Sequence, residues 1–285
     1  MTSWPDDYSG AWTLGGRAEI EGIGLHSGAP ARVRLAPASR AGFWLGWLDA
    51  PDLPPQRLEP RLVCETTLCT TLDLAGRRLA TVEHLLAALA GTGLTHVEIW
   101  VEGAEVPLLD GSALPWVNLI AEAGMRSLGS LPERPRLGRP LTLQTGSSFV
   151  TAMSAEELHL GAAIDFDQPA IGRQVLALAL TPRTFVAEIA PARTFGLLSQ
   201  VEQLRAAGLI QGGALDNALV CDGERWLNPP LRFADEPVRH KILDLLGDLA
   251  LVGLPRAQVF AYRGSHRLHT DLASALDVEL SLLPA

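Results

Sequence analysis

Three polar side chains recur at every fourth position of an apolar stretch, VRHKILDLLGDLA at residues 238–250: His240, Asp244 and Asp248. Residues four apart on an α-helix lie one turn apart on the same face, so the three would form one polar stripe. An exposed ion pair between His240 and Asp244, worth about 0.2–0.5 kcal/mol, would account for two of them. Asp248 extends the stripe well into the apolar part of the helix, where a carboxylate needs a cation, a metal ion or several donors. The pattern therefore favours a metal ion held by His240 and Asp244.

A catalytic zinc site normally has three protein ligands and an open position for water. His84 is the best third ligand among the seven histidines, because it lies in the apolar helical pattern TVEHLLAALA at residues 81–90. Glu83 directly precedes it, and a carboxylate beside a ligand can act as general base on the attacking water. A polar pair on a solvent-exposed face is the alternative interpretation of Glu83 and His84.

His266 lies in YRGSHRLH, residues 262–269, near a predicted junction between a strand and a helix. Functional side chains are frequent at such junctions. His266 could act as general acid, and Asp248 could orient it and raise its pKa. By its surroundings alone, the histidine could equally be a helix cap or a surface residue. The remaining candidates, His96, His159 and His269, are assigned to structural or exposed positions.

His26 lies in a glycine-rich turn, GIGLHSG at residues 22–28. The spacing misses the G-x-G-x-x-G pattern by one residue, and no helix is expected to follow. The turn therefore does not predict a dinucleotide-binding site.

The composition is that of an ordinary globular protein, with 285 residues, 47% hydrophobic and 19% charged. This length suits one large domain or two smaller ones. The formal charge of −9 argues against nonspecific binding of nucleic acid. We expect a cytoplasmic protein, because no secretory signal and no membrane-spanning run are visible. The three cysteines lack a C-x-x-C pair, which favours reduced thiols: Cys64, Cys69 and Cys221.

A proline-rich, charged segment, LPERPRLGRP at residues 131–140, predicts a linker near the middle of the chain. Each half is expected to hold several strands and two helices, which predicts layered α/β or α+β sheets. The expected strands are 32–35, 43–48, 96–101, 158–166, 175–180, 217–221 and 258–262. The expected helices are 82–90 (capped by Thr81), 114–123 (capped by Ser112 and stopped by Gly124), 199–207 (stopped by Gly208) and 235–252 (ending before Gly253).

Four segments in this order resemble the UDP-3-O-acyl-N-acetylglucosamine deacetylases, the zinc enzymes of the committed step of lipid A synthesis. They are IEGIGLHSG at 20–28, TVEHLLAALAGTG at 81–93, EVPLLDGSA at 105–113 and LRFADEPVRHKILDLLGDL at 231–249. ARTFG at 192–196 and GGALDNA at 212–218 strengthen the resemblance, which covers nearly the whole chain.

The resemblance implies an α+β fold of two similar α/β sandwich domains, each a sheet layered with two helices, with the active site between them. We assign residues 1–131 to the first domain and 138–285 to the second. The family implies zinc bound by His84, His240 and Asp244, with Fe2+ as the alternative metal. It implies that Glu83 is the general base, that His266 protonates the leaving amine, and that Asp248 supports His266.

Substrate contacts are also implied by the resemblance. Thr194 matches the hydroxyl that stabilises the oxyanion, and Phe195 is assigned to substrate binding. Lys241 and Arg263 match cationic groups near the diphosphate of UDP, and Phe166 matches a ring that meets the uracil. The implied reaction is hydrolysis of the N-acetyl amide of UDP-3-O-acyl-N-acetylglucosamine by a monomeric protein without a membrane span.

Several positions depart from the family pattern, and they bear on substrate affinity and acyl-chain preference. Gln200 replaces a frequent acidic residue, GLTH at 93–96 replaces GID‑N, and Gly264-Ser265 replaces Ser-Gly before His266. Residues 144–152 lack a lysine that many members carry. Two alternatives remain open. One is an iron(II) oxygenase with a facial triad of two histidines and a carboxylate; the other is a non-catalytic sugar-nucleotide-binding protein on the same scaffold.

Overall fold

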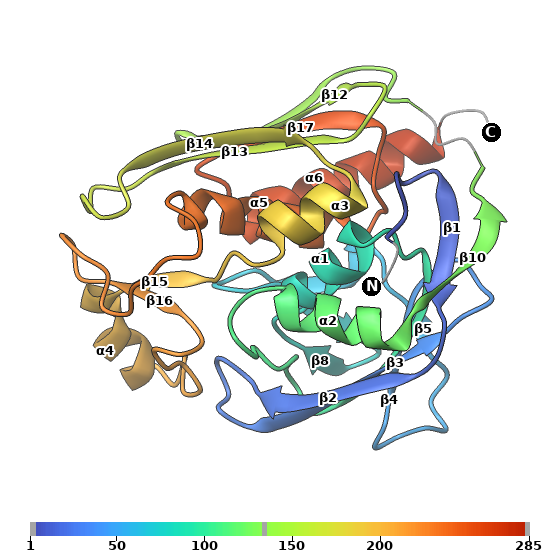
Figure 1. Cartoon of the computed structure of the whole chain (residues 1–285), viewed down its shortest axis with the longest axis horizontal. Helices are drawn as coiled ribbons and strands as arrows, with labels where there is room; N and C mark the ends of the chain where they lie inside the picture. Colours follow the sequence, from blue (N-terminus) through green and yellow to red (C-terminus); the bar gives the residue numbers. More distant parts are fainter. Residues whose placement is uncertain (1–3, 133–135, 283–285) are drawn as a thin grey trace.

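The computed structural model describes residues 4–132 and 136–282, which form an α+β fold with two large sheets. The sheets lie on the outside, and helices from both halves of the chain pack against one another between them (Figure 1). The predicted fold class is thereby confirmed. No helix in the described ranges has the length and apolarity needed to cross a bilayer.

The first large sheet is built from the N-terminal half, in the order β10-β1-β9-β3-β2, with β4 paired to β9 and β5 to β4. In β3 and β9 alternate side chains are buried, which directs one face of the sheet toward the helices. The bounds are β1 (Gly10–Leu14), β2 (Ala18–Ile23), β3 (Pro30–Pro37), β4 (Gly42–Trp47), β5 (Gln56–Arg57), β9 (His96–Glu102) and β10 (Met125–Ser130). A short helix η1 (Pro60–Leu62) precedes a three-stranded sheet of β6 (Val63–Glu65), β7 (Thr71–Leu74) and β8 (Arg77–Leu79).

The second large sheet is built from the C-terminal half, in the order β11-β12-β17-β13-β14. Its strands are β11 (Leu141–Thr145), β12 (Ser148–Ser154), β13 (His159–Asp165), β14 (Arg173–Ala179) and β17 (Ala257–Tyr262). Two short helical segments follow β14, α3 (Pro182–Thr184) and η2 (Phe185–Ile189). The parallel pair β15 (Phe195–Leu197) and β16 (Leu219–Cys221) carries α4 (Leu198–Ala206) away from the layers (Figure 1).

Both halves repeat one order of elements: a helix, a strand inserted in the middle of the sheet, and a second helix. These are α1 (Glu83–Gly91), β9 and α2 (Leu114–Ala123), then α5 (Glu236–Leu249), β17 and α6 (His266–Ser281). β9 has antiparallel β3 on one side and parallel β4 on the other, and β17 has antiparallel β12 and parallel β13. The expected similarity of the halves is therefore visible in topology. The domain bounds 1–131 and 138–285 stay a prediction, and residues 133–135 of the expected linker, like 1–3 and 283–285, lie outside the described residues.

Two details of the expected helices differ from the structure. Within the C-terminal half, the helix that packs against α5 is α6, which is not among the helices expected from the sequence. The expected helix at 199–207 forms α4, which buries no residue. Thr81 does not cap α1, because its hydroxyl donates to Glu105 (2.9 Å) and the helix begins after Val82 without a side-chain cap. The stop at Gly124 is confirmed, since this residue follows α2 with φ of 69°.

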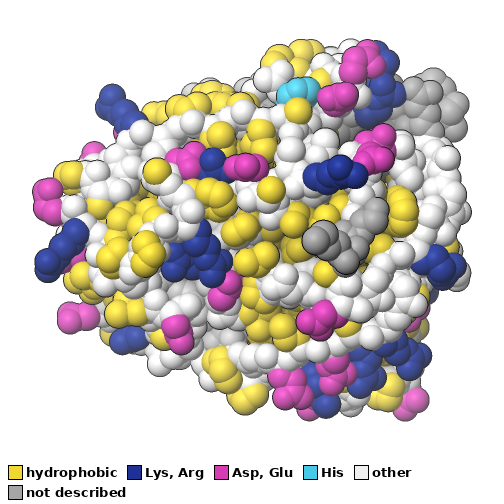
Figure 2. Space-filling model, in the orientation of Figure 1, with side chains coloured by type: hydrophobic (Ala, Val, Ile, Leu, Met, Phe, Trp, Pro, Cys, Tyr) yellow, Lys and Arg dark blue, Asp and Glu magenta, His cyan; other side chains and the backbone are white. Residues whose placement is uncertain are grey.

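Charged side chains of both signs are interspersed over the face in Figure 2, and they do not segregate into one basic surface. Ion pairs also connect neighbouring segments of the first sheet, such as Arg34 with Glu19 and Arg40 with Glu98. This face therefore lacks the concentrated positive charge that nonspecific binding to a polyanion requires.

The main contact between helices of the two halves is the packing of α1 on α5. Gly247 of α5 lies against the backbone of Glu83, and a methyl group added at Gly247 would overlap the Glu83 carbonyl oxygen. A side chain at this position would push apart the two helices that the site residues occupy.

Gly247→Ala should therefore destabilise the protein. At an exposed helical site the same change would gain about 1 kcal/mol from helix propensity, but overlap with backbone atoms costs about 1–3 kcal/mol. Urea denaturation should show a lower free energy of unfolding. Gly196→Ala is the control, because an added methyl group there meets no atom within 4 Å. An unchanged or raised stability of Gly247→Ala would contradict the packing.

Candidate active site

α1 and α5 bring together three buried side chains that could bind a metal ion: His84, His240 and Asp244. One ligand atom from each lies within 4.8 Å of the others. Asp244 Oδ1 is 3.3 Å from His240 Nε2 and 3.7 Å from His84 Nε2. The two imidazole rings are nearly perpendicular, with centroids 4.9 Å apart. The three ligand atoms thus converge on one point from both halves of the chain.

Neighbouring groups orient these ligands. Lys241 Nζ donates to Asp244 Oδ2 (2.9 Å), which leaves Oδ1 facing the imidazoles. His240 Nδ1 lies 3.0 Å from the carbonyl oxygen of Ala192, which can only accept, so Nδ1 carries the proton and Nε2 keeps its lone pair. His84 Nδ1 is buried and has no hydrogen-bond partner in the described part of the chain.

The charge states of the three groups suit a divalent cation. Burial, together with His240, lowers the pKa of His84 to about 3, and burial also lowers the pKa of His240. Burial works to raise the pKa of Asp244, but Lys241 and His240 hold it well below its ordinary value. Two neutral imidazoles and one carboxylate are a common ligand set of catalytic zinc sites. The residues present therefore fit a bound divalent metal ion.

Glu83, the first residue of α1, is 3% exposed and lies beside this cluster. Its Oε2 accepts the backbone N–H of Thr70 (3.1 Å), and its Oε1 is 4.0 Å from His266 Nε2. Burial raises the pKa of Glu83 to about 7, even though His266 pulls the pKa down. A carboxyl group with this pKa can both take up and release a proton near neutral pH.

Asp248 does not face the metal ligands but connects α5 to α6. It is fully buried, and its Oδ2 lies 3.0 Å from Nδ1 of both His266 and His269. Its Oδ1 accepts the hydroxyl of Thr70 (2.5 Å). Burial lowers the pKa of His266, but the charge and hydrogen bond of Asp248 outweigh this and raise the pKa to about 9. His266 is therefore a protonated imidazole held at the first residue of α6.

A cavity of about 280 Å³ opens onto these groups. Thr194, Phe195 and Lys241 line it, along with the candidate ligands, Glu83 and His266. Phe166 does not line it but packs edge-on against Phe195, with ring centroids 5.5 Å apart. Arg263 is exposed at the end of β17, outside this lining, and its guanidinium donates to Ser147 (3.4 Å). The structure thus brings the candidate residues together except for two. Arg263 lies outside the lining of the cavity, and Phe166 lies behind Phe195, which it contacts.

Two residues in this network, Thr70 and His269, were not predicted as site residues from the sequence. Thr70 lies in an irregular segment before β7, and its role depends on contacts across the fold. His269, assigned to a structural or exposed position, is buried against Asp248. Gly264 leaves room for its ring, because a Cβ there would lie 2.5 Å from His269 Nε2. Ser265 caps α6 by accepting the N–H of Leu268 (3.3 Å).

A buried set of two imidazoles and a carboxylate, with a carboxylate and a cationic imidazole beside it, is typical of metal-dependent hydrolases. The family model described as UDP-3-O-acyl N-acetylglycosamine deacetylase matches residues 11–277. The chain belongs to this family, and the resemblance inferred from its motifs is confirmed.

Individual relatives of this chain are named as deacetylases of the same family. A UDP-3-O-acyl-N-acetylglucosamine deacetylase of Thermosynechococcus vestitus is 50% identical over 273 residues, covering 93% of each chain. The protein of the same name in a Nostoc species is 48% identical over 266 residues, covering 90% of this chain and 94% of the relative. One from Nitratidesulfovibrio vulgaris is 41% identical over 264 residues, covering 92% of this chain and 85% of the relative.

Asp248→Asn should lower the pKa of His266. The substitution removes the negative charge that raises this pKa but leaves the burial that lowers it, so the titration should move from about 9 to markedly lower pH. NMR titration of the histidine ring in the metal-free protein would measure the shift. Thr70→Val is the control, because it removes a hydrogen bond to Asp248 and keeps the charge. A pKa that is unchanged in Asp248→Asn would contradict this account.

Proposed function

We propose that this protein hydrolyses the N-acetyl amide of UDP-3-O-acyl-N-acetylglucosamine, giving UDP-3-O-acyl-glucosamine and acetate, the committed step of lipid A biosynthesis. The family and the names of the relatives support the substrate. The observation that carries the chemistry is the buried triad of His84, His240 and Asp244, with Glu83 and His266 next to each other in the lining of the same cavity.

His84, His240 and Asp244 would hold the metal ion, with Zn2+ as the expected metal and Fe2+ as the alternative. A bound zinc ion would act as a Lewis acid toward the amide carbonyl and would lower the pKa of a water molecule. Lys241 keeps Asp244 ionised and correctly oriented. The Ala192 carbonyl fixes the tautomer of His240 that leaves Nε2 free to bind.

Glu83 and His266 divide the proton transfers between them. Glu83 takes the proton of the attacking water, for which its pKa of about 7 is well matched near neutral pH. His266 donates its proton to the amine nitrogen as the bond between that nitrogen and the carbonyl carbon breaks. Asp248 holds His266 in the protonated form and directs Nε2 toward the cavity, because Nδ1 is engaged with its carboxylate.

The remaining contacts concern the substrate. Thr194 lines the cavity, and its hydroxyl could donate to the oxyanion that forms on the carbonyl oxygen. Lys241 supplies positive charge next to the triad, whereas Arg263 lies outside the lining, so its part in diphosphate binding stays a prediction. Phe195 and Phe166 pack edge to face beside the cavity and offer an aromatic surface to a uracil ring.

The two alternative functions gain no support from the relatives, whose names describe deacetylases. An oxygenase would consume dioxygen, and a binding protein would bind the sugar nucleotide without releasing acetate. A single assay of acetate release and oxygen uptake by the metal-loaded protein separates all three. The cytoplasmic location and the monomeric state stay predictions.

Removing any one of the proposed metal ligands should release the metal ion. In His84→Ala, His240→Ala and Asp244→Ala, two remaining ligands bind far more weakly than three, so metal content and acetate release should fall together. Elemental analysis of the purified variants measures the content. His159→Ala is the control, because His159 lies on β13 outside the cavity lining. A full equivalent of metal in Asp244→Ala would rule out its role as a ligand.

Glu83→Gln should keep the metal ion and lose the reaction. The amide cannot accept a proton from water, so kcat should fall by about 10²–10⁴, the usual contribution of a positioned general base. Turnover and metal content are to be measured on the same sample. If Glu83→Gln retains most of the parent's kcat, another group serves as the base.

A further inference from the structure

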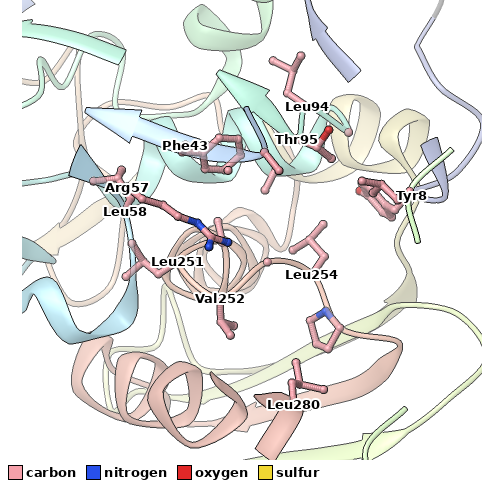
Figure 3. A pocket seen from close by; sticks show the side chains of 18 of the residues that line it. Tyr8, Phe43, Arg57, Leu58, Leu94, Thr95, Leu251, Val252, Leu254 and Leu280 are labelled. Carbon is pink, nitrogen blue, oxygen red and sulfur yellow. The ribbon is translucent and has the colours of Figure 1, made fainter. Parts of the chain in front are cut away.

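A second cavity, of about 360 Å³, lies at the opposite ends of the two helices that carry the candidate ligands. It is bounded by the segment that follows α1, by the segment that follows α5, and by the β4–β5 edge of the first sheet (Figure 3). It shares no lining residue with the catalytic cavity. The two cavities are therefore separate binding spaces within one fold.

The side chains that form the walls of this second cavity are mainly apolar, and polar side-chain and backbone atoms complete the lining. Side chains from both halves of the chain form them, including Phe43, Leu58, Leu94, Leu251, Val252 and Leu254. No aspartate or glutamate lines it among the described residues. The hydroxyl of Thr95, its main neutral polar group, is already engaged with Trp12 and His96. Water is poorly accommodated by such walls, whereas a hydrocarbon chain is well accommodated.

Arg57 is the one charged side chain in the described lining. Figure 3 shows it extending from β5 over the cavity, with its guanidinium above Leu251 and Val252. Arg57 is an exposed residue at the mouth of the cavity, and its guanidinium has no hydrogen bond or ion pair with another residue in the described part of the chain. The backbone of Arg57 is positioned by the sheet, where it pairs with Trp44. Its side chain passes close to Gly42, where a Cβ would lie 2.9 Å from Arg57 Nε.

The apolar side chains and the guanidinium of Arg57 together indicate which kind of ligand would fit this cavity. A guanidinium that faces apolar walls binds a carboxylate strongly and in a bidentate manner. A small anion would leave the apolar side chains uncovered, and a neutral chain would make no charge-assisted hydrogen bond with the guanidinium, which would stay hydrated by solvent. The volume is at the lower end of the range for ligand cavities, which suits one chain and not a diacyl lipid.

An adjoining hollow shares Tyr8, Leu131, Pro132, Leu254 and Pro255 with the cavity. It is also lined by Asp6, Asp7, Glu156, Glu157 and Arg256, and both Asp6 and Glu156 already form ion pairs with arginines. Because Arg57 is the one charged side chain in the described lining of the cavity itself, a carboxylate belongs at Arg57 and its chain points inward. We propose that this cavity is a binding site for a medium-chain fatty acid carboxylate, separate from the catalytic cavity and independent of the proposed deacetylase activity.

The test is calorimetric titration of the full-length, metal-loaded protein with decanoate. We expect saturable binding of one equivalent, with decanol bound about tenfold more weakly, because it lacks the charge-assisted pair, and no measurable binding of acetate. Arg57→Gln should weaken decanoate binding about tenfold and leave decanol binding unchanged. Arg78→Gln is the matched control, since it makes the same change of charge on β8, outside the lining.

Two further variants locate the site. Val252→Trp should fill the cavity and abolish binding, whereas Phe195→Ala, in the catalytic cavity, should leave decanoate affinity unchanged. Acetate release by Arg57→Gln at the parent's rate would show that this variant is folded. The proposal is overturned if decanoate does not bind saturably, if Arg57→Gln binds it as well as the parent does, or if Phe195→Ala abolishes binding. The Arg57 and Arg78 pair remains decisive even if Val252→Trp fails to fold.

Discussion

The contact between α1 and α5 is the constraint on which the candidate active site depends. Glu83 and His84 belong to one half of the chain, and His240 and Asp244 to the other, so no local folding rule brings them together. Gly247 allows the two helix backbones to approach more closely than any side chain would permit. Because both helices are buried on almost every side, their relative position is fixed by packing with the two sheets. Precise ligand geometry thus follows from the apolar core.

The same close packing concentrates charge in a space from which water is largely excluded. Glu83, Asp244 and Asp248 are all buried there, while Lys241 and His266 supply positive charge. When all five are ionised, the carboxylates outnumber the cations by one. A buried excess of negative charge opposes folding unless a cation binds or a carboxyl group takes up a proton. Burial is the main reason why the pKa of Glu83 rises to about 7, and the charges of Asp248 and Asp244 add to that rise. A divalent cation bound in this space would therefore stabilise the fold as well as take part in the chemistry.

Helical spacing correctly predicted that His240, Asp244 and Asp248 lie along one side of α5, but it did not predict that they would contact different partners. Each step of four residues turns about 40° around the helix axis, so Asp248 faces a different neighbour from His240. His240 and Asp244 meet His84 of α1, whereas Asp248 meets His266 and His269 of α6. The pattern of one helix identifies which side chains share a face. The partners that they contact come from other segments of the chain: Thr70 lies in an irregular segment 178 residues away from Asp248 in sequence, and His269 lies in α6, which is not among the helices expected from the sequence.

The departures from the family pattern lie in three different places, and none of them is one of the candidate metal ligands or acid–base residues. Ser265 caps α6 at the residue before His266, and Gly264 leaves room for His269, so the exchanged Gly-Ser order is compatible with the contacts that hold His266 and His269 against Asp248. Thr95 lies on the wall of the second cavity, where its hydroxyl ties β1 to the start of β9. Gln200 lies on the exposed α4. The proposed metal ligands and acid–base residues are held by α1, α5 and the first turn of α6, so changes at Thr95 and Gln200 do not alter the contacts that position them.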